Sequence, residues 1–124
     1  MAQILVIDDD EIMRDVVVQM LTEAGYSVQS AEDGRKGLRI FYDGAFDLVV
    51  TDLIMPEKEG LEVIQELRAH SHSIPIIAIS GGGRMSPDGY LKMAQAFGVD
   101  YTFTKPFMIE SFLAAVRECV AGIK

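Results

Sequence analysis

The 124-residue sequence lacks several features that would assign it to a specialised class of protein. Its single cysteine, Cys119, excludes an intrachain disulfide, and its helical surroundings predict a buried thiol. No apolar run reaches the about 18 residues that a membrane span needs, and no charged start with a short apolar stretch marks a secretory leader. We therefore expect a cytoplasmic protein with no membrane contact.

Basic residues are also few, with 11 Lys and Arg against 19 Asp and Glu, and they form no run. The formal net charge of -8 would repel a phosphate backbone, so direct binding to nucleic acid is not expected. A hydrophobic share of 49% is that of a globular chain, and the length suits one domain over residues 1–124. Proteins and cations are the expected partners.

Five short apolar runs alternate with longer segments of helical period, and no linker interrupts the alternation. The runs predict strands. The first, third and fourth are apolar on both faces, which is typical of a parallel sheet that helices cover on two sides. The predicted strands are Gln3–Ile7, Ser27–Ala31, Asp47–Thr51, Ile74–Ile79 and Tyr101–Thr104.

Helical segments follow the predicted strands, and capping residues mark several of their ends. Asp10 is a cap for the first helix, and Ser86-Pro87 predicts the start of the fourth. The predicted helices run from Asp10 to Gly25, over Gly34–Tyr42 and Glu59–Ala69, from Ser86 to Gly98, and over Ile109–Val120. The pattern predicts an α/β fold, (βα)5, with a doubly wound parallel five-stranded sheet.

Polar residues able to do chemistry stand where the predicted strands end. Asp8 and Asp9 follow the first strand, Asp52 the third, Ser80 the fourth and Lys105 the fifth. In doubly wound folds the ligand crevice lies outside the carboxyl ends of the strands, so these residues are expected to converge. Each one alone could be a cap, a solvated charge or a turn residue. Their shared placement favours a site.

The chemistry of this set points to phosphoryl transfer. Three carboxylates within about 5 Å would repel by roughly 3 kcal/mol per pair at an effective dielectric of about 20. Lys105 can neutralise one charge and a divalent cation the rest, and hard oxygen ligands suit Mg²⁺, with Mn²⁺ as an alternative. In that company Asp52 is a nucleophile toward phosphorus, while Ser80, Lys105 and the cation can each bind one phosphoryl oxygen.

Four blocks of the sequence resemble the receiver domain of two-component response regulators, in the order and spacing of that family. They are VIDDDEIMR (Val6–Arg14), DLVVTDLIMPEKEG (Asp47–Gly60), IIAIS (Ile76–Ser80) and FTKPF (Phe103–Phe107). The resemblance extends over essentially the whole chain. It implies a CheY-like, flavodoxin-like sheet with strand order 2-1-3-4-5.

The resemblance implies that Asp52 accepts a phosphoryl group from a sensor histidine kinase or a histidine phosphotransfer protein. Asp8 and Asp9 would hold Mg²⁺ together with Asp52 and the backbone carbonyl of Ile54. The domain would be no enzyme beyond its own phosphorylation and dephosphorylation. It would signal to a downstream protein or output domain through a phosphorylation-dependent surface change, with phosphorylation-dependent dimerisation as an open alternative.

Thr102 departs from the family pattern. Ser80 matches the residue whose hydroxyl reports phosphorylation, and Lys105 matches the lysine of the family's K-P block. Receiver domains commonly carry an aromatic residue three positions before that lysine, where this chain has Thr102, and Tyr101 is expected on the opposite face of the strand. We expect the connection that begins with Gly81–Gly83 to carry the conformational response instead.

Two other functions remain open. Asp8–Ile12 loosely resembles the nucleophile motif of haloacid-dehalogenase-like phosphohydrolases, in which Asp8 would be phosphorylated. The later acidic metal motif of that family is absent, because Ser80 and glycines occupy its place. The other alternative is a receiver-like binding module that works without phosphorylation. Phosphorylation of Asp52, of Asp8 or of neither residue distinguishes the three functions.

Overall fold

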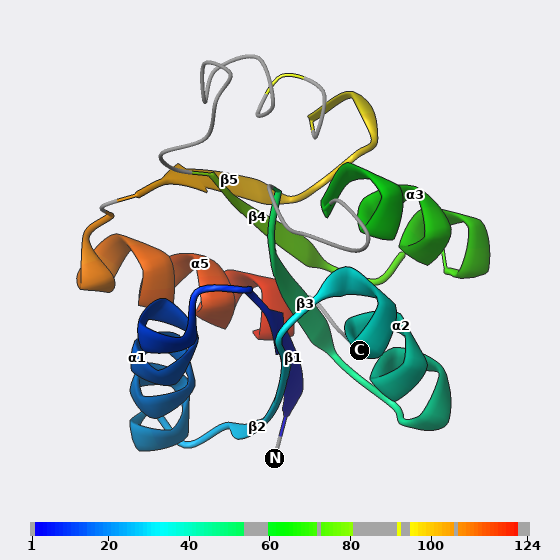
Figure 1. The fold of residues 1–124 in the computed structure, drawn as a ribbon. Helices are drawn as coiled ribbons and strands as arrows, with labels where there is room; N and C mark the ends of the chain where they lie inside the picture. Colours follow the sequence, from blue (N-terminus) through cyan, green and yellow to red (C-terminus); the bar gives the residue numbers. More distant parts are fainter. Residues whose placement is uncertain are drawn as a thin grey trace.

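The structure, a computed structural model, describes residues 2–53, 60–71, 73–80, 92, 95–105 and 107–121. Its strands are β1 (Gln3–Ile7), β2 (Ser27–Ala31), β3 (Leu48–Asp52), β4 (Ile76–Ser80) and β5 (Tyr101–Thr104). All four pairings are parallel and form one sheet in the order β2-β1-β3-β4-β5 (Figure 1). The predicted strand order is confirmed.

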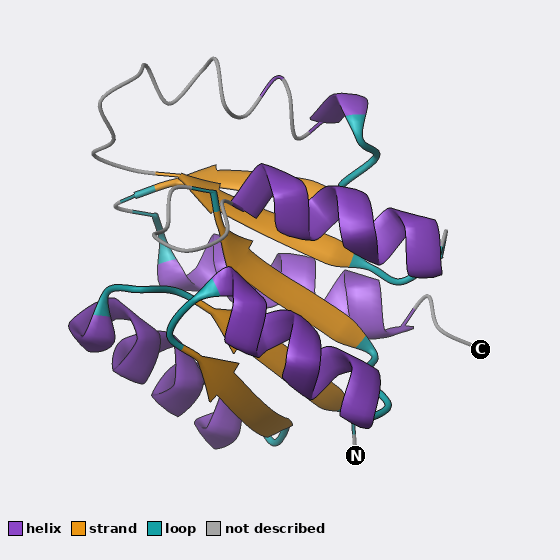
Figure 2. Cartoon of the chain, turned by 45° about the vertical axis from the view of Figure 1, so that its right-hand side comes forward, coloured by secondary structure: helices purple, strands orange, loops and turns teal. Residues whose placement is uncertain are grey.

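Helices cover both faces of the sheet (Figure 2). Within the described ranges they are α1 (Glu11–Glu23), α2 (Gly34–Asp43), α3 (Gly60–His70) and α5 (Ile109–Ala121). α1 and α5 pack on one face, and α2 and α3 pack on the other. The doubly wound arrangement is therefore as predicted. In the described part of the chain, no helix is long and apolar enough to cross a membrane.

The bounds of β3 and β4 differ from the predicted ones by one or two residues. β3 ends at Asp52 and β4 ends at Ser80, so both site residues belong to the strands. The hydrogen-bond ladder explains the difference, because the Leu53 N–H donates to the Ile79 carbonyl at 2.9 Å and the Lys105 N–H donates to the Ser80 carbonyl at 2.7 Å. Backbone pairing thus reaches past both site residues.

The predicted fourth helix begins outside the described residues, at Ser86-Pro87. Its expected end is described. Gln95 and Ala96 are helical, and the Gly98 N–H donates to the Gln95 carbonyl at 3.0 Å. Gly98 has a φ of 81°, a left-handed conformation that glycine adopts without strain and that commonly ends a helix. This end agrees with the prediction.

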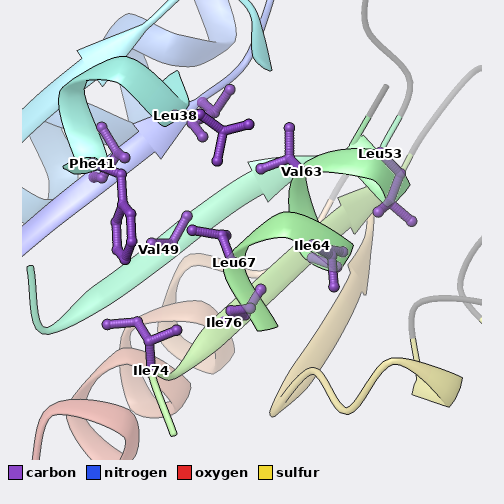
Figure 3. Packing of buried hydrophobic residues seen from close by; sticks show 12 residues of the cluster. Leu38, Phe41, Val49, Leu53, Val63, Ile64, Leu67, Ile74 and Ile76 are labelled. Atoms are coloured by element: carbon purple, nitrogen blue, oxygen red, sulfur yellow. The ribbon is translucent and has the colours of Figure 1, made fainter. Parts of the chain in front are cut away.

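Branched aliphatic side chains fill both sides of the sheet, and β3 and β4 are buried along their whole length. On the side of α2 and α3, Figure 3 labels Leu38, Phe41, Val49, Leu53, Val63, Ile64, Leu67, Ile74 and Ile76. Burial of each such side chain contributes about 1.5–3 kcal/mol. The strands are therefore a rigid base for the residues at their ends.

Cys119 lies on the inner face of α5, where 7% of its surface is exposed, as predicted. Burial, reinforced by the carboxylates of Asp100 and Glu118, raises the pKa of the thiol to about 12. Since the thiolate is the reactive form, the protonated thiol fills the core and is inert at neutral pH.

Gly60 starts α3 directly against the end of β3. A Cβ on Gly60 would lie 2.1 Å from the carbonyl oxygen of Asp52 and 2.5 Å from the Cα of Leu53. These are backbone atoms of a buried strand, so only glycine lets the helix begin this close. Gly37 of α2 faces a side chain instead, since its Cβ would lie 2.4 Å from the Cδ1 of Ile7. That close approach explains a glycine inside α2.

Replacing Gly60 by alanine should lower the free energy of unfolding by about 1–3 kcal/mol, because the added methyl group overlaps fixed backbone. Chemical denaturation followed by circular dichroism measures the change. Gly37→Ala is the matched control. It gains about 1 kcal/mol of helix propensity and meets the side chain of Ile7 instead of backbone atoms, so its loss should be smaller. A loss for Gly60→Ala no larger than that of the control would contradict the steric explanation.

Candidate functional site

The carboxyl ends of four strands bring five of the predicted site residues to one edge of the sheet. Asp8 and Asp9 follow β1, Asp52 and Ser80 end β3 and β4, and Lys105 follows β5. Residues as far apart in sequence as Asp8 and Lys105, separated by 97 positions, are in direct contact. The sheet places these residues together as expected, whereas their chemical roles remain predictions.

Three carboxylates form the acidic part of the site. Oxygen atoms of Asp8, Asp9 and Asp52 lie within 4.8 Å of one another. Asp8 and Asp52 are 3% and 6% exposed, whereas Asp9 is open to solvent. The group consists of hard oxygen ligands and is open to water on one side, which suits Mg²⁺ or Mn²⁺ better than a metal that prefers sulfur or imidazole.

Lys105 contributes a positively charged side chain to the site. Its Nζ lies 3.2 Å from Oδ2 of Asp8 and 3.4 Å from Oδ2 of Asp52. Burial lowers the pKa of Lys105, but the charges and hydrogen bonds of the two carboxylates outweigh it and hold that pKa above its ordinary value. Lys105 is therefore charged at neutral pH and offsets part of the repulsion between two buried carboxylates.

Local hydrogen bonds fix the orientation of Asp8. The Asp10 N–H donates to Oδ1 of Asp8 at 2.9 Å, and Nη1 of Arg14 donates to the Asp8 carbonyl at 2.9 Å. Oδ1 is thereby turned toward the backbone and Oδ2 toward Lys105. Sequence reasoning assigned Arg14 no role. The sequence feature that could have indicated this contact is a basic residue one turn into the helix that follows Asp8 and Asp9.

Asp10 serves the helix and lies outside the acidic group. Its side chain accepts hydrogen bonds from the N–H groups of Ile12 and Met13, at 3.1 and 3.2 Å, and caps α1 as predicted. The side chains of the acidic run Asp8–Asp10 therefore face in two directions. Its first two residues turn toward the site, and the third neutralises the start of the helix.

Ser80 is fully buried, with 0% of its surface exposed. Its Oγ makes no hydrogen bond with the described residues. A buried hydroxyl without a partner costs about 1–3 kcal/mol, so its presence calls for an explanation. Ser80 stands one position beyond Ile79, the register partner of Asp52, so Ser80 and Asp52 lie at the ends of neighbouring strands.

Two predicted features lie outside the described residues. One is the backbone carbonyl of Ile54, expected as a metal ligand, and the other is the connection that begins with Gly81–Gly83. Both remain predictions.

Thr102 and Tyr101 face opposite sides of β5, as strand alternation predicts. Thr102 is the register partner of Ala78, and Tyr101 packs with the core on the side of α5. The Tyr101 hydroxyl donates to the Glu118 carboxylate on α5. Tyr101 is thus held against α5 and does not take the place of an aromatic residue at position 102.

A doubly wound sheet with an acidic, lysine-paired group of side chains at the carboxyl ends of its strands matches the class of CheY-like receiver domains. The family model of the response regulator receiver domain matches residues 4–117, and the chain belongs to this family. This family membership does not favour the alternative in which the chain is a haloacid-dehalogenase-like phosphohydrolase.

Curated relatives are similar over nearly the whole chain. The response regulator MprA of Mycolicibacterium vanbaalenii is 37% identical over 115 residues, which are 93% of this chain and 48% of that protein. The DNA-binding dual master transcriptional regulator RpaA of Synechocystis is 38% identical over 121 residues, with coverage of 94% and 48%. The chain therefore spans about half the length of the curated relatives it matches.

Solved structures match the fold from end to end. A response regulator receiver domain protein from Clostridium thermocellum superposes with a TM-score of 0.90 at 26% identity, covering 98% of this chain and 96% of that one. The chemotaxis protein CheY4 of Vibrio cholerae gives a TM-score of 0.84 at 30% identity, with coverage of 96% and 98%.

Asp8→Asn should weaken Mg²⁺ binding by at least about tenfold, because it removes one of three converging carboxylates. Isothermal titration calorimetry measures the dissociation constant. Asp10→Asn is the matched control, since it removes the same charge from the neighbouring position and keeps a good N-cap. Its Mg²⁺ affinity should stay near that of the parent protein. Equal losses in the two variants would indicate a diffuse charge effect and contradict the acidic group as the metal site.

Proposed function

We propose that Asp52 accepts a phosphoryl group from a sensor histidine kinase or a histidine phosphotransfer protein, in a Mg²⁺-dependent reaction. The observation that carries the proposal is the position of Lys105, whose ammonium lies between the buried carboxylates of Asp8 and Asp52. A lysine between two carboxylates at a ligand-binding sheet edge is suited to receive a further anion, such as a transferred phosphoryl group.

Asp52 is better placed than its neighbours to act as the nucleophile. Asp8 lies beyond the end of β1, and its Oδ1 accepts a hydrogen bond from the Asp10 N–H, which turns that oxygen toward the backbone. Asp9 is solvated, which weakens the electrostatic control that the site can exert over it. Asp52 ends a fully buried central strand, and its backbone is fixed on both sides. These constraints support attack by an Asp52 oxygen on phosphorus, with the donor's imidazole as the leaving group.

The remaining residues have separate roles in the proposal. Asp8, Asp9 and Asp52 would hold Mg²⁺, which when bound neutralises charge on the phosphoryl oxygens. The Lys105 ammonium would bind a second oxygen, because its raised pKa keeps it charged throughout. The buried hydroxyl of Ser80 would donate to a third oxygen and gain the partner that it lacks among the described residues. The domain would then catalyse only its own phosphorylation and dephosphorylation.

The response to phosphorylation would be read by another protein surface. The relatives named above are regulators about twice as long as this chain, and one is named as DNA-binding. We therefore propose that residues 1–124 form one receiver domain that acts on an output domain or a downstream protein, with phosphorylation-dependent dimerisation as an alternative. The net charge of -8 argues against direct contact of this domain with nucleic acid.

Incubation with acetyl phosphate and Mg²⁺, followed by mass-spectrometric mapping, should place the phosphoryl group on Asp52. Asp52→Asn should remain unmodified, and chelation of the metal should abolish the modification of the parent protein. Modification of Asp8 would support the phosphohydrolase alternative. A protein that folds and binds Mg²⁺ but is modified nowhere would support a binding module and contradict the proposal.

The change Ser80→Ala should have opposite effects on the stability of the protein and on its phosphorylation. Removal of a buried hydroxyl that has no partner among the described residues is expected to raise the free energy of unfolding of the unphosphorylated protein by about 1 kcal/mol. The same change should slow phosphorylation of Asp52, because one donor to the transferred group is lost. Ser30→Ala, at an exposed position of β2, is the control and should change neither quantity. An unchanged phosphorylation rate in Ser80→Ala would exclude the proposed role of the hydroxyl.

A further inference from the structure

The outer face of α2 carries two arginines that no other described residue neutralises. Arg35, Lys36 and Arg39 are all exposed. Lys36 pairs with Glu32, whose hydrogen bond and charge raise the pKa of Lys36. Across the described ranges, Arg35 and Arg39 take part in no ion pair or hydrogen bond. In a chain with a net charge of -8, two guanidinium groups therefore share one helix face without an ion-pair partner among the described residues.

A groove of about 460 Å³ lies beside these arginines, between α2 and α3. These two helices lie side by side on the same face of the sheet (Figure 1). Arg35, Leu38, Arg39 and Tyr42 line the groove from α2, and Glu66 lines it from α3. Leu38 and Arg39 lie three and four positions after Arg35, and Tyr42 lies seven positions after it, a spacing that puts the four residues on one face of the helix. The groove thus combines cationic and apolar surface along one helix.

Tyr42 is half exposed, yet other rings hold it in place. Its ring centroid lies 5.8 Å from that of Phe41 and 5.1 Å from that of His70, both in edge-to-face geometry. His70 also contacts Phe41, with ring centroids 5.7 Å apart, so three rings support one another. A ring fixed in this way loses little conformational freedom when a ligand packs on it. Tyr42 is therefore a prepared contact surface at the edge of the groove.

We propose that the groove between α2 and α3 docks an acidic segment of a partner protein. Arg35 and Arg39, one helical turn apart, would each bind a carboxylate, since the guanidinium fork matches carboxylate geometry. An apolar side chain of the segment would rest on Tyr42 and Leu38. The occupant is thus a peptide segment in which acidic and apolar residues alternate.

Charge favours a peptide over the other polyanions that could reach this surface. The chain as a whole has a net charge of -8, which repels an unbroken row of phosphates more strongly than a segment with a few spaced carboxylates. Such a segment can place its charges at Arg35 and Arg39. The proposal involves no residue of the phosphoryl site and is tested on unphosphorylated protein, so either proposal can fail without the other.

The test uses a fluorescein-labelled peptide of alternating glutamate and leucine, and fluorescence anisotropy with the full chain as the readout. A peptide with lysine for each glutamate and a single-stranded DNA of equal negative charge are the comparison ligands. We expect only the acidic peptide to bind, and more weakly at higher salt. The double change Arg35→Gln with Arg39→Gln should raise its Kd by about tenfold or more.

Lys36→Gln is the matched control, because it removes a cation from the same helix that is already paired with Glu32. Its Kd should stay within about twofold of that of the parent protein. Amide shifts in nuclear magnetic resonance spectra should be confined to α2 and α3, and thermal melts should show that every variant folds. The proposal is overturned by equal losses in the control and the double variant, by shifts on α1 or α5, by DNA binding at least as tight, or by no peptide binding at millimolar concentration.

Discussion

Two buried carboxylates that share one ammonium group are the contact on which this site depends. Asp8 follows β1, Asp52 ends the neighbouring strand β3, and both are almost fully buried, so without Lys105 they would repel each other in a poorly screened environment. Lys105 can reach both only because β1, β3 and β5 end at the same edge of one sheet. The apolar layers on both faces hold that edge in place, and Gly60 lets α3 begin against it.

Lys105 offsets only part of the negative charge of the site, and the charge that is left indicates which ligands the site can bind. Among the described residues of the site, three carboxylates and one ammonium group sum to two negative charges, which a divalent cation would balance. Ser80 adds a buried hydroxyl that the described residues leave without a partner. A protein selected for stability alone would have apolar or paired groups in these places. Both features become favourable when a cation and an anionic group bind together, which is the situation of phosphoryl transfer.

Sequence reasoning succeeded where one local pattern determines the structure. Strands buried on both faces are continuous apolar runs, and residues at their carboxyl ends must meet at one edge, which made the fold and the acidic group predictable. It failed where the outcome depends on a neighbouring element. Asp52 and Ser80 are the last residues of their strands because backbone pairing with the adjacent strands continues to them, and Gly37 is suited to a helix that approaches Ile7 closely. The Arg14 contact depends on the phase of α1 relative to β1, which no short motif encodes.

Two faces of the domain thus have different electrostatic characters. The strand ends gather negative charge around one lysine, and the outer face of α2 carries two arginines that have no ion-pair partner among the described residues. The central claim concerns the first face. A crystal structure with Mg²⁺ and beryllofluoride tests it most directly: we predict the metal among Asp8, Asp9 and Asp52, and the beryllofluoride on Asp52 in contact with Ser80 and Lys105. A metal bound elsewhere, or beryllofluoride on Asp8, would contradict the account.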